Sequence, residues 1–327
     1  MIRNIHFIVN PAAAKKEPLL SIINEVFNNS DVSYDVSITK KRNDIHGIAS
    51  SLIGKTDLIA IYGGDGCVME LAQVLGKTET AMAIIPAGTA NVMAKELGIP
   101  LDTKAAIQML LASDSEIIKI DMGLINYRPF LIRINLGVMA EMILQANRGL
   151  KNHLGQLAYG VTALNSLNEA LPVMYSMTID GKRIDQEGVS LTVTNSGNIG
   201  INGYSMLPDI SVTDGMLDVV LMNQANLIDI LKVASTTLLQ TESSVLKHWK
   251  CRDITIHMDE EHRFICDEPA CSPSLLPWGW GTRRAIWMIL SLRRMHTREV
   301  DRMDDPSTNM LRIWARLAVG SLFIPLL

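Results

Sequence analysis

Short apolar runs alternate with amphipathic segments over the first third of the chain. The runs predict strands, and the segments between them carry apolar residues at the spacing of a helix. The predicted strands are residues 5–10, 34–39, 58–62 and 82–85, and the predicted helices are residues 18–28, 44–53, 67–75, 91–97 and 102–112. Such alternation is typical of a parallel sheet that helices cover on both faces.

Beyond about residue 115 the pattern changes to short runs separated by turn signals such as Asp180-Gly181. These runs predict antiparallel strands. They lie at residues 117–120, 130–136, 173–179, 189–194, 217–222, 254–258 and 264–266, with helices expected around residues 139–170 and 226–240. The expected fold is therefore an α/β N-terminal domain with a parallel sheet, followed by a mainly antiparallel β second domain.

The last stretch, residues 272–327, differs from the rest in composition. It holds eight arginines, no lysine and four of the five tryptophans. One interpretation is a surface at a membrane interface, where both residue types are favoured. The other, which the lack of recognisable closing strands favours, is a tail altered by a change of reading frame that does not pack. The expected domains are residues 1–120, residues 121–271 and an atypical Arg/Trp-rich tail, residues 272–327.

The overall composition narrows the class of protein. The chain of 327 residues has a formal net charge of −4 and four cysteines. No basic stripe dominates it, which argues against nucleic acid as a partner, and the irregular cysteines do not suit a disulfide scaffold. No apolar run of about eighteen residues predicts a membrane span, and residues 1–10 predict a strand instead of a cleavable leader. We therefore expect a cytoplasmic protein.

The candidate chemistry begins between the strand at residues 58–62 and the helix at residues 67–75, where Gly63, Gly64, Asp65 and Gly66 follow one another. Glycines at a strand-to-helix turn let a ligand approach the main chain, and the amides that open the helix suit a phosphate. Asp65 would repel phosphate unless it orients a hydroxyl or holds Mg²⁺ through water. A tight turn that merely needs glycine would give the same sequence.

Two more predicted strands end in polar loops. Residues 86–91, Pro-Ala-Gly-Thr-Ala-Asn, join a strand to a helix, and Asn10-Pro11 ends the first strand. In an open α/β sheet, ligands bind at the carboxyl ends of the strands. The three loops are therefore expected to form one site.

Together these segments resemble the diacylglycerol kinase catalytic-domain family, which includes bacterial diacylglycerol kinases, related lipid kinases and sphingosine kinases. Its signatures are an early Asn-Pro, a strand followed by Gly-Gly-Asp-Gly-Thr, and Pro-x-Gly-Thr-x-Asn, and the match covers most of residues 1–270. The resemblance implies an NAD kinase/diacylglycerol kinase-like fold and an ATP- and Mg²⁺-dependent enzyme of phospholipid biosynthesis. Its substrate would be a lipid alcohol such as diacylglycerol at the membrane surface, to which the enzyme would bind peripherally; a homodimer is left open. The implied nucleotide contacts are Asn10, Thr39, Gly63, Gly64, Asp65, Gly66, Glu70, Thr89 and Asn91.

Two segments of the second domain also resemble the family. Residues 148–159 carry its basic Lys-x-x-x-Gly-x-x-Ala-Tyr pattern, and residues 206–218 carry its Pro-to-Asp-Gly-x-Leu-Asp pattern. In bacterial members the second segment holds a structural Mg²⁺ through backbone carbonyls and an acidic side chain. The resemblance makes Asp218 the first candidate ligand and Asp214 the second, and hard oxygen ligands suit this ion. An ordinary polar β-turn is the alternative.

The sequence departs from the family at the catalytic base. The family has Asp-Gly-Glu-Pro on a late strand, with the Asp as general base, whereas residues 266–269 here are Cys-Asp-Glu-Pro. Alignment on Glu-Pro puts the base at Cys266, and a one-residue deletion puts it at Asp267. A carboxylate suits the role better than a thiol, so Asp267, with Glu268 beside it, is the expected catalytic site. Cys67 at the motif threonine and Val92 in the third loop are further departures.

Three other interpretations remain. NAD kinases also carry Gly-Gly-Asp-Gly after a strand, although Asn10-Pro11 and the segment from Asp214 to Asp218 favour the lipid branch. The altered base motif and the tail would also fit a catalytically degraded lipid- or nucleotide-binding protein. A zinc site is the third, because His257, His262, Cys266 and Cys271 lie close in sequence, but their spacing matches no paired-ligand pattern of structural zinc.

Overall fold

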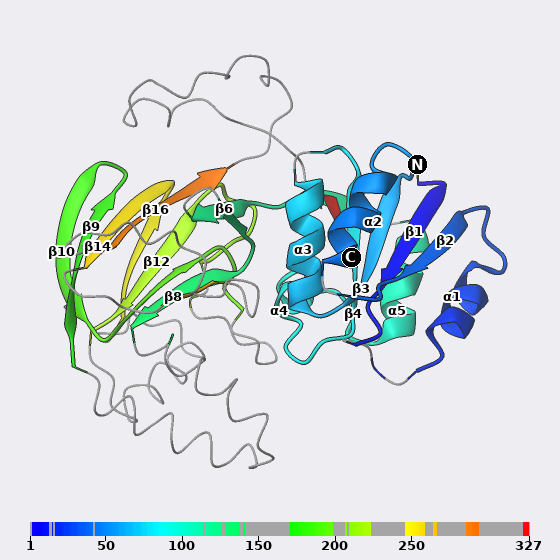
Figure 1. The fold of residues 1–327 in the computed structure, drawn as a ribbon, viewed down its shortest axis with the longest axis horizontal. Coiled ribbons are helices and arrows are strands. Elements are labelled where there is room, and N and C mark those ends of the chain that lie inside the picture. The colour runs from blue at the N-terminus through cyan, green and yellow to red at the C-terminus, as the bar shows by residue number, and fades with distance from the viewer. Residues whose placement is uncertain are drawn as a thin grey trace, which may run out of the picture. The chain divides into compact units, whose positions relative to one another are not determined.

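A computed structural model of the protein describes residues 2–12, 15, 17–41, 43–76, 78–113, 115–125, 128–137, 140, 171–198, 207, 209–223, 246–258, 264–266, 286–293 and 323–326. The chain divides into two compact units (Figure 1). The first unit comprises Met1–Met122 with Arg293–Leu327, and the second comprises Gly123–Leu292. The helices expected around residues 139–170 and 226–240 lie outside the described residues, apart from Ala140.

The first unit is built on a parallel sheet with the strand order β2-β1-β3-β4. The strands are β1 (Asn4–Val9), β2 (Ser33–Ile38), β3 (Leu58–Gly63) and β4 (Ala81–Pro86). The helices are α1 (Leu19–Phe27), α2 (Asp44–Leu52), α3 (Asp65–Leu75), α4 (Val92–Glu96) and α5 (Thr103–Gln108), which runs into the 3₁₀ turn η1 (Met109–Leu111). The predicted α/β fold is confirmed.

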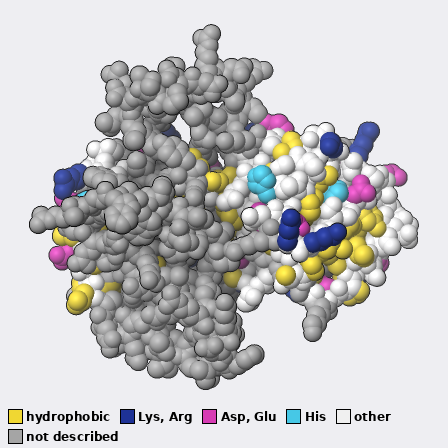
Figure 2. All heavy atoms as spheres, in the orientation of Figure 1, with side chains coloured by type: hydrophobic (Ala, Val, Ile, Leu, Met, Phe, Trp, Pro, Cys, Tyr) yellow, Lys and Arg dark blue, Asp and Glu magenta, His cyan; other side chains and the backbone are white. Residues whose placement is uncertain are grey.

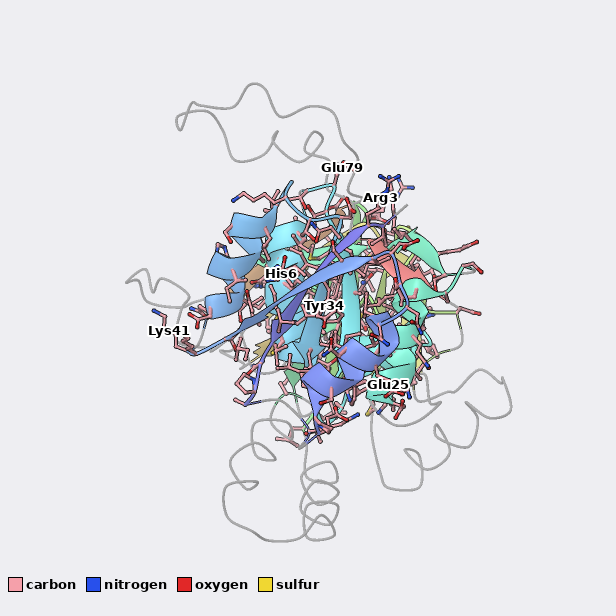
Figure 3. The ribbon with its side chains drawn as sticks, turned by 90° about the vertical axis from the view of Figure 1, so that its right-hand side faces the viewer. Arg3, His6, Glu25, Tyr34, Lys41 and Glu79 are labelled. Atoms are coloured by element: carbon pink, nitrogen blue, oxygen red, sulfur yellow. The ribbon has the colours of Figure 1, made fainter. Side chains whose placement is uncertain are left out.

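Helices cover both faces of this sheet. α2 lies beside α3 and α1 lies beside α5, one pair on each face (Figure 3). Every residue of β3 and β4 is buried, which explains their continuous apolar sequences. On the α1 face, Phe7 of β1 packs edge-on against Phe27, with ring centroids 5.9 Å apart.

The second unit contains two sheets, in the strand orders β10-β9-β14-β16-β6-β7 and β13-β12-β11-β8-β15. The strands are β6 (Met122–Ile125), β7 (Arg128–Phe130), β8 (Arg133–Gly137), β9 (Val173–Ile179), β10 (Lys182–Gly188), β11 (Ser190–Thr194), β12 (Leu217–Met222), β13 (Leu246–Cys251), β14 (Asp253–Met258), β15 (Phe264–Cys266) and β16 (Ile286–Arg293). One apolar core joins residues of both sheets, for example Met177 and Ile256 with Leu191 and Val219. The predicted antiparallel β domain is confirmed.

Several strands of the structure are not predicted by the sequence pattern, for different reasons. β10 and β13 carry many charged and polar residues at the edges of their sheets, which hides the alternating pattern. β16 falls in the stretch for which no closing strand was expected, yet it lies between β14 and β6. Its sequence begins Ile-Trp-Met-Ile-Leu, an apolar run suited to an inner strand that the arginines around it obscured. Further along, β17 (Phe323–Leu326) pairs with β5 (Glu116–Lys119).

The described surface mixes side chains of different kinds. On the face that Figure 2 shows, basic, acidic and apolar side chains are interspersed over the described residues. In the part of the chain that the structure describes, no helix is long and apolar enough to cross a membrane.

Candidate functional site

The topological switch point of the first sheet lies between β1 and β3. From β1 the chain goes to β2 on one side, and it then returns to form β3 on the other side of β1. Open α/β sheets bind ligands outside the carboxyl ends of the strands at such a point. Asn10 and Gly63 stand at these two strand ends, and the Asn10 amide donates to the Tyr62 carbonyl at 3.1 Å.

The loops that follow β3 and β4 touch through their glycines. The Ala87 amide donates to the Gly63 carbonyl at 2.9 Å. A Cβ added to Gly88 would lie 2.5 Å from the Gly64 Cα, and one added to Gly64 would lie 3.1 Å from the Gly88 Cα. The close approach of the two main chains therefore requires glycine at positions 64 and 88.

Asp65 links the same two loops. Its Oδ1 accepts the Met93 amide of α4 at 3.2 Å. Burial raises the pKa of the Asp65 carboxyl, and hydrogen bonds from the Met93, Val92 and Asn91 amides offset only part of that effect. The sequence leaves Asp65 the roles of orienting a hydroxyl or a metal; in the structure its side chain also stabilises the start of α4.

Asn91 closes the loop after β4. Its Oδ1 accepts the Gly88 amide at 2.8 Å, and its Nδ2 donates to the Gly88 carbonyl at 2.9 Å. The residue has a left-handed φ of 49° and is buried, a backbone conformation that Asn tolerates better than most residues. Thr89, within the ring that these bonds close, is exposed. Asn91 therefore shapes the loop, and Thr89 is the side chain that the loop presents.

Asn10 is held by Cys67, a contact that the sequence analysis did not foresee. The Asn10 Nδ2 donates to the Cys67 Sγ at 3.0 Å, and its Oδ1 accepts the Ala12 amide at 3.0 Å. Burial raises the pKa of the Cys67 thiol, so the sulfur stays protonated and acts as a weak acceptor. Cys67 thus supplies an acceptor where the family motif has a hydroxyl.

The two remaining candidate residues of the first unit, Thr39 and Glu70, hydrogen-bond to the neighbouring strand and helix. Thr39 is buried, and its amide and hydroxyl both donate to the Val9 carbonyl, at 2.9 and 3.3 Å. Glu70 Oε1 accepts the His46 amide in the first turn of α2 at 3.2 Å. The structure therefore brings Asn10, the 63–66 loop and the 88–91 loop together, and it attaches Thr39 to the end of β1 and Glu70 to α2.

A carboxylate clamp beside the glycine loop was also missed. Glu17 Oε1 accepts the Tyr62 hydroxyl at 2.5 Å and the Thr103 hydroxyl at 2.6 Å. Burial raises the pKa of Tyr62, and its hydrogen bond to Glu17 adds to this. The Glu17 clamp therefore connects three segments: Tyr62 directly before Gly63, the segment after Asn10 that contains Glu17, and Thr103 at the start of α5. The sequence held one signal for this contact: Tyr62 follows four aliphatic residues of β3, and its hydroxyl needs a hydrogen-bond partner.

In the second unit, the β13-β12-β11-β8-β15 sheet has one apolar and one polar face. Successive strand residues point to opposite faces. Leu217, Val219 and Leu221 of β12 belong to the core, and the residues between them face the other way. The register aligns the side chains of that second face, which are Asn135 of β8, Thr192 and Thr194 of β11, Asp218 of β12, and His248 and Lys250 of β13.

Cys266 faces the apolar core. It pairs with Ile134 and is 1% exposed, within the same cluster as Leu136 and Val193. A thiol in that position does not reach the polar face. Asp267 and Glu268, the expected catalytic residues, lie outside the described residues.

The expected Mg²⁺ ligands are both engaged in contacts with β13. Asp218 is fully buried, and its Oδ1 hydrogen-bonds to the His248 Nε2 at 2.6 Å, while its Oδ2 has no partner. Asp214 Oδ2 accepts the Lys250 Nζ at 2.7 Å, and its Oδ1 accepts the Met216 amide at 2.9 Å. A divalent ion would find the Asp218 Oδ2 unpaired, but it would have to displace the Lys250 ammonium to reach the Asp209 carbonyl and the Asp214 Oδ2. The donor set as it stands therefore does not fit Mg²⁺ well.

The described residues offer no other metal site. His257 lies in β14 and Cys266 in β15, which belong to different sheets, and His262 and Cys271 lie outside the described residues. No group of three or more His, Cys, Asp or Glu side chains within the described ranges could hold a metal ion.

The family comparisons agree with both units. Residues 4–125 match the model of the diacylglycerol kinase catalytic domain, and residues 133–267 match that of the YegS C-terminal NAD kinase beta sandwich-like domain. The chain therefore carries a diacylglycerol kinase catalytic domain, followed by a YegS C-terminal NAD kinase beta sandwich-like domain.

Individual relatives carry related names. The chain is 29% identical to the diacylglycerol kinase of Bacillus subtilis (strain 168) over 248 residues, 72% of this chain and 79% of the relative. It is 33% identical over 191 residues to a Pseudomonas aeruginosa (strain UCBPP-PA14) protein named "Probable lipid kinase YegS-like", across 57% of this chain and 62% of the relative.

Solved structures share the fold. A crystal structure of a diacylglycerol kinase from Bacillus anthracis str. Sterne matches with a TM-score of 0.65 and 19% identity, across 89% of this chain and 94% of that one.

Proposed function

We propose that the protein is an ATP-dependent lipid kinase that transfers the γ-phosphoryl group to the hydroxyl of a lipid such as diacylglycerol. The observation that carries this proposal is the close approach of the 63–66 and 88–91 loops at the switch point of the first sheet, where a Cβ on Gly88 would collide with Gly64. The match to the diacylglycerol kinase catalytic domain and the names of the relatives support the choice of a lipid kinase.

In this proposal the first unit binds ATP. Gly64 is the N-cap of α3 and has no side chain with which to cap it. The Cys67 amide donates to the Gly64 carbonyl, which leaves the Gly66 amide at the helix start for a phosphate. Thr89 would donate its hydroxyl and Asn10 its amide group, while the Glu17 clamp and Asn91 hold the loops in position. Mg²⁺ would accompany the nucleotide, where it neutralises charge on the phosphates; Asp65 and Thr89 are the residues of these loops that would face it.

The second unit would supply the general base. Cys266 faces the core, and neighbouring side chains on a strand alternate between faces. If β15 continued regularly, the side chain of residue 267 would therefore lie on the polar face of the sheet, with those of Asn135 and Thr192. This reasoning supports Asp267 over Cys266 as the base and over Glu268, its neighbour. The base would remove the proton from the lipid hydroxyl as that oxygen attacks phosphorus.

The test is a transfer assay with purified protein, radiolabelled ATP and Mg²⁺. Its acceptors are diacylglycerol and other lipid alcohols, presented in anionic vesicles, and NAD in solution. We expect label in a lipid, and we expect the protein to float with the vesicles as a peripheral membrane protein. Label in NAD would identify an NAD kinase. ATP binding without transfer to any acceptor would identify a degraded, nucleotide-binding relative, and absence of ATP binding would contradict the site itself.

A further inference from the structure

The turn from Asp209 to Asp218 is acidic, and one lysine of a neighbouring strand, Lys250, donates hydrogen bonds to it. Lys250 of β13 stands directly opposite Asp218 of β12 in the sheet register. Its Nζ donates to the Asp209 carbonyl and to the Asp214 Oδ2, each at 2.7 Å. One ammonium group therefore joins the beginning of the turn to its middle.

Groups of the protein already bind the Asp209 carbonyl, both carboxylate oxygens of Asp214 and one of Asp218, which leaves the Asp218 Oδ2 unpaired. Asp214 uses one oxygen for Lys250 and the other for the Met216 amide, across a turn in which Gly215 has a φ of 76°. His248 holds one oxygen of Asp218. A Mg²⁺ ion requires several oxygens in near-octahedral arrangement and would have to displace the ammonium to obtain them.

The electrostatics agree with this arrangement. The Lys250 ammonium lies at the Asp209 carbonyl and the Asp214 carboxylate, and its residue stands opposite Asp218 in the sheet. The side chains are partly exposed, 34% for Lys250 and 28% for Asp214, so water screens the pair only in part. The positive charge therefore lies where the acidic residues of the turn come together.

We propose that the Lys250 ammonium is the built-in cation of the 209–218 turn, so that this turn keeps its shape without a divalent metal. The residues of the family pattern are present, but the positive charge at their centre comes from the chain itself. This inference does not depend on the proposed function, because neither of its tests uses ATP or lipid.

The first test is the thermal unfolding of the full chain, followed by circular dichroism after treatment with EDTA and again with added MgCl₂. Lys250→Met removes the charge and keeps most of the side chain, and Lys247→Met is the matched control on the same strand, where the lysine donates to Gln186. We expect Lys250→Met to lower the Tm by ~2–4 °C and Mg²⁺ to restore part of that loss. The wild type and Lys247→Met should keep the same Tm with and without Mg²⁺. A wild type stabilised by Mg²⁺, or a Lys250→Met variant with an unchanged Tm, would overturn the proposal.

The second test decides the matter if Lys250→Met does not fold. Mn²⁺ binding to the EDTA-treated wild type, without nucleotide, is measured by electron paramagnetic resonance and compared with binding to Asp214→Asn and Asp218→Asn. We expect the two substitutions to leave Mn²⁺ binding unchanged. A bound ion in the wild type that either substitution removes would show that the turn holds a metal, contrary to the proposal.

Discussion

The two units present their polar groups in different ways. In the first unit the candidate site is mainly backbone. Of the side chains near it, Asp65 and Asn91 accept backbone amides, and Asn10 donates to the Cys67 thiol. In the second unit the polar groups are side chains on regular strands, aligned by the sheet register. Substitutions in the first unit should therefore alter the shape of the site, whereas substitutions on the polar face of the second should alter its chemistry.

The largest effect should come from shortening the chain. Two truncations compare the loss of β16, an inner strand of the second unit, with the loss of β17, a strand of the first. A chain that ends at residue 285 lacks β16 and leaves β14 and β6 without the strand that joins them. We expect it to aggregate, because inner strand edges would be exposed. A chain that ends at Arg293 keeps β16 and loses β17, and should stay folded in the second unit. Size-exclusion chromatography and circular dichroism distinguish the two. Equal solubility of both chains would contradict the inner position of β16.

The next effect concerns the base. Asp267→Asn should reduce the rate of transfer by roughly 10²–10⁴-fold while ATP binding persists, because the variant loses only proton removal. Cys266→Ser, a near-isosteric change in the core, is the control, and it should keep its rate. Both are measured by the lipid phosphorylation assay alongside calorimetric ATP binding. A fully active Asp267→Asn would move the base to another residue of the polar face.

A backbone substitution tests the first unit. Gly88→Ala should weaken ATP binding and reduce transfer by about 10²-fold, because the added Cβ would force the 88–91 loop away from Gly64. Gly47→Ala, in α2, is the matched control, since a Cβ there would have no atom within 4 Å, and it should raise stability slightly. If Gly88→Ala binds ATP like the wild type, the close approach of the loops is not needed for the site.

Substitution of Asp65 should have a smaller effect and should separate its two roles, as acceptor for the Met93 amide and as a negative charge at the site. Loss of the acceptor for the Met93 amide should lower the free energy of unfolding by about 1 kcal/mol in Asp65→Ala. Asp65→Asn keeps an acceptor and should retain most of that stability, yet lose transfer if the charge is needed. Urea unfolding and the transfer assay are the two measurements. Wild-type stability in Asp65→Ala would contradict the link between the loops.

The pH dependence of stability should show the smallest effect. Because burial raises the pKa of Asp65 in the folded protein, the protonated carboxyl stabilises the fold below its ordinary pKa, and this contribution is lost as the pH rises through the raised value. The free energy of unfolding of the wild type, relative to that of Asp65→Asn, should fall as the pH rises from about 4, near the ordinary pKa of an aspartate, through the raised value. Urea titrations across that range measure it. A relative stability that rises with pH there would show that the pKa of Asp65 is lowered by folding instead of raised.

How far the sequence could predict the molecule depends on whether a feature is local. Apolar runs and glycine turns predicted β1 to β4 and the three loops, because strand ends and helix starts follow from neighbouring residues. The contact between Gly64 and Gly88, the Asn10–Cys67 hydrogen bond and the Glu17 clamp join distant segments, and nothing in the local pattern specifies such pairs. The orientation of Cys266 likewise follows from the register of β15 with β8, which the sequence alone does not give.

The position of β16 has a consequence for the order in which the protein can fold during synthesis. β6 leaves the ribosome early, but the strand that pairs it with the rest of its sheet, β16, is made more than a hundred residues later. The sheet of β1 to β4 is local and can form while the remainder is still being translated, since domains generally fold as units from the N-terminal end. The six-stranded sheet must wait for nearly the whole chain, and in the meantime β6 and β14 have edges that a chaperone or a neighbouring chain could bind.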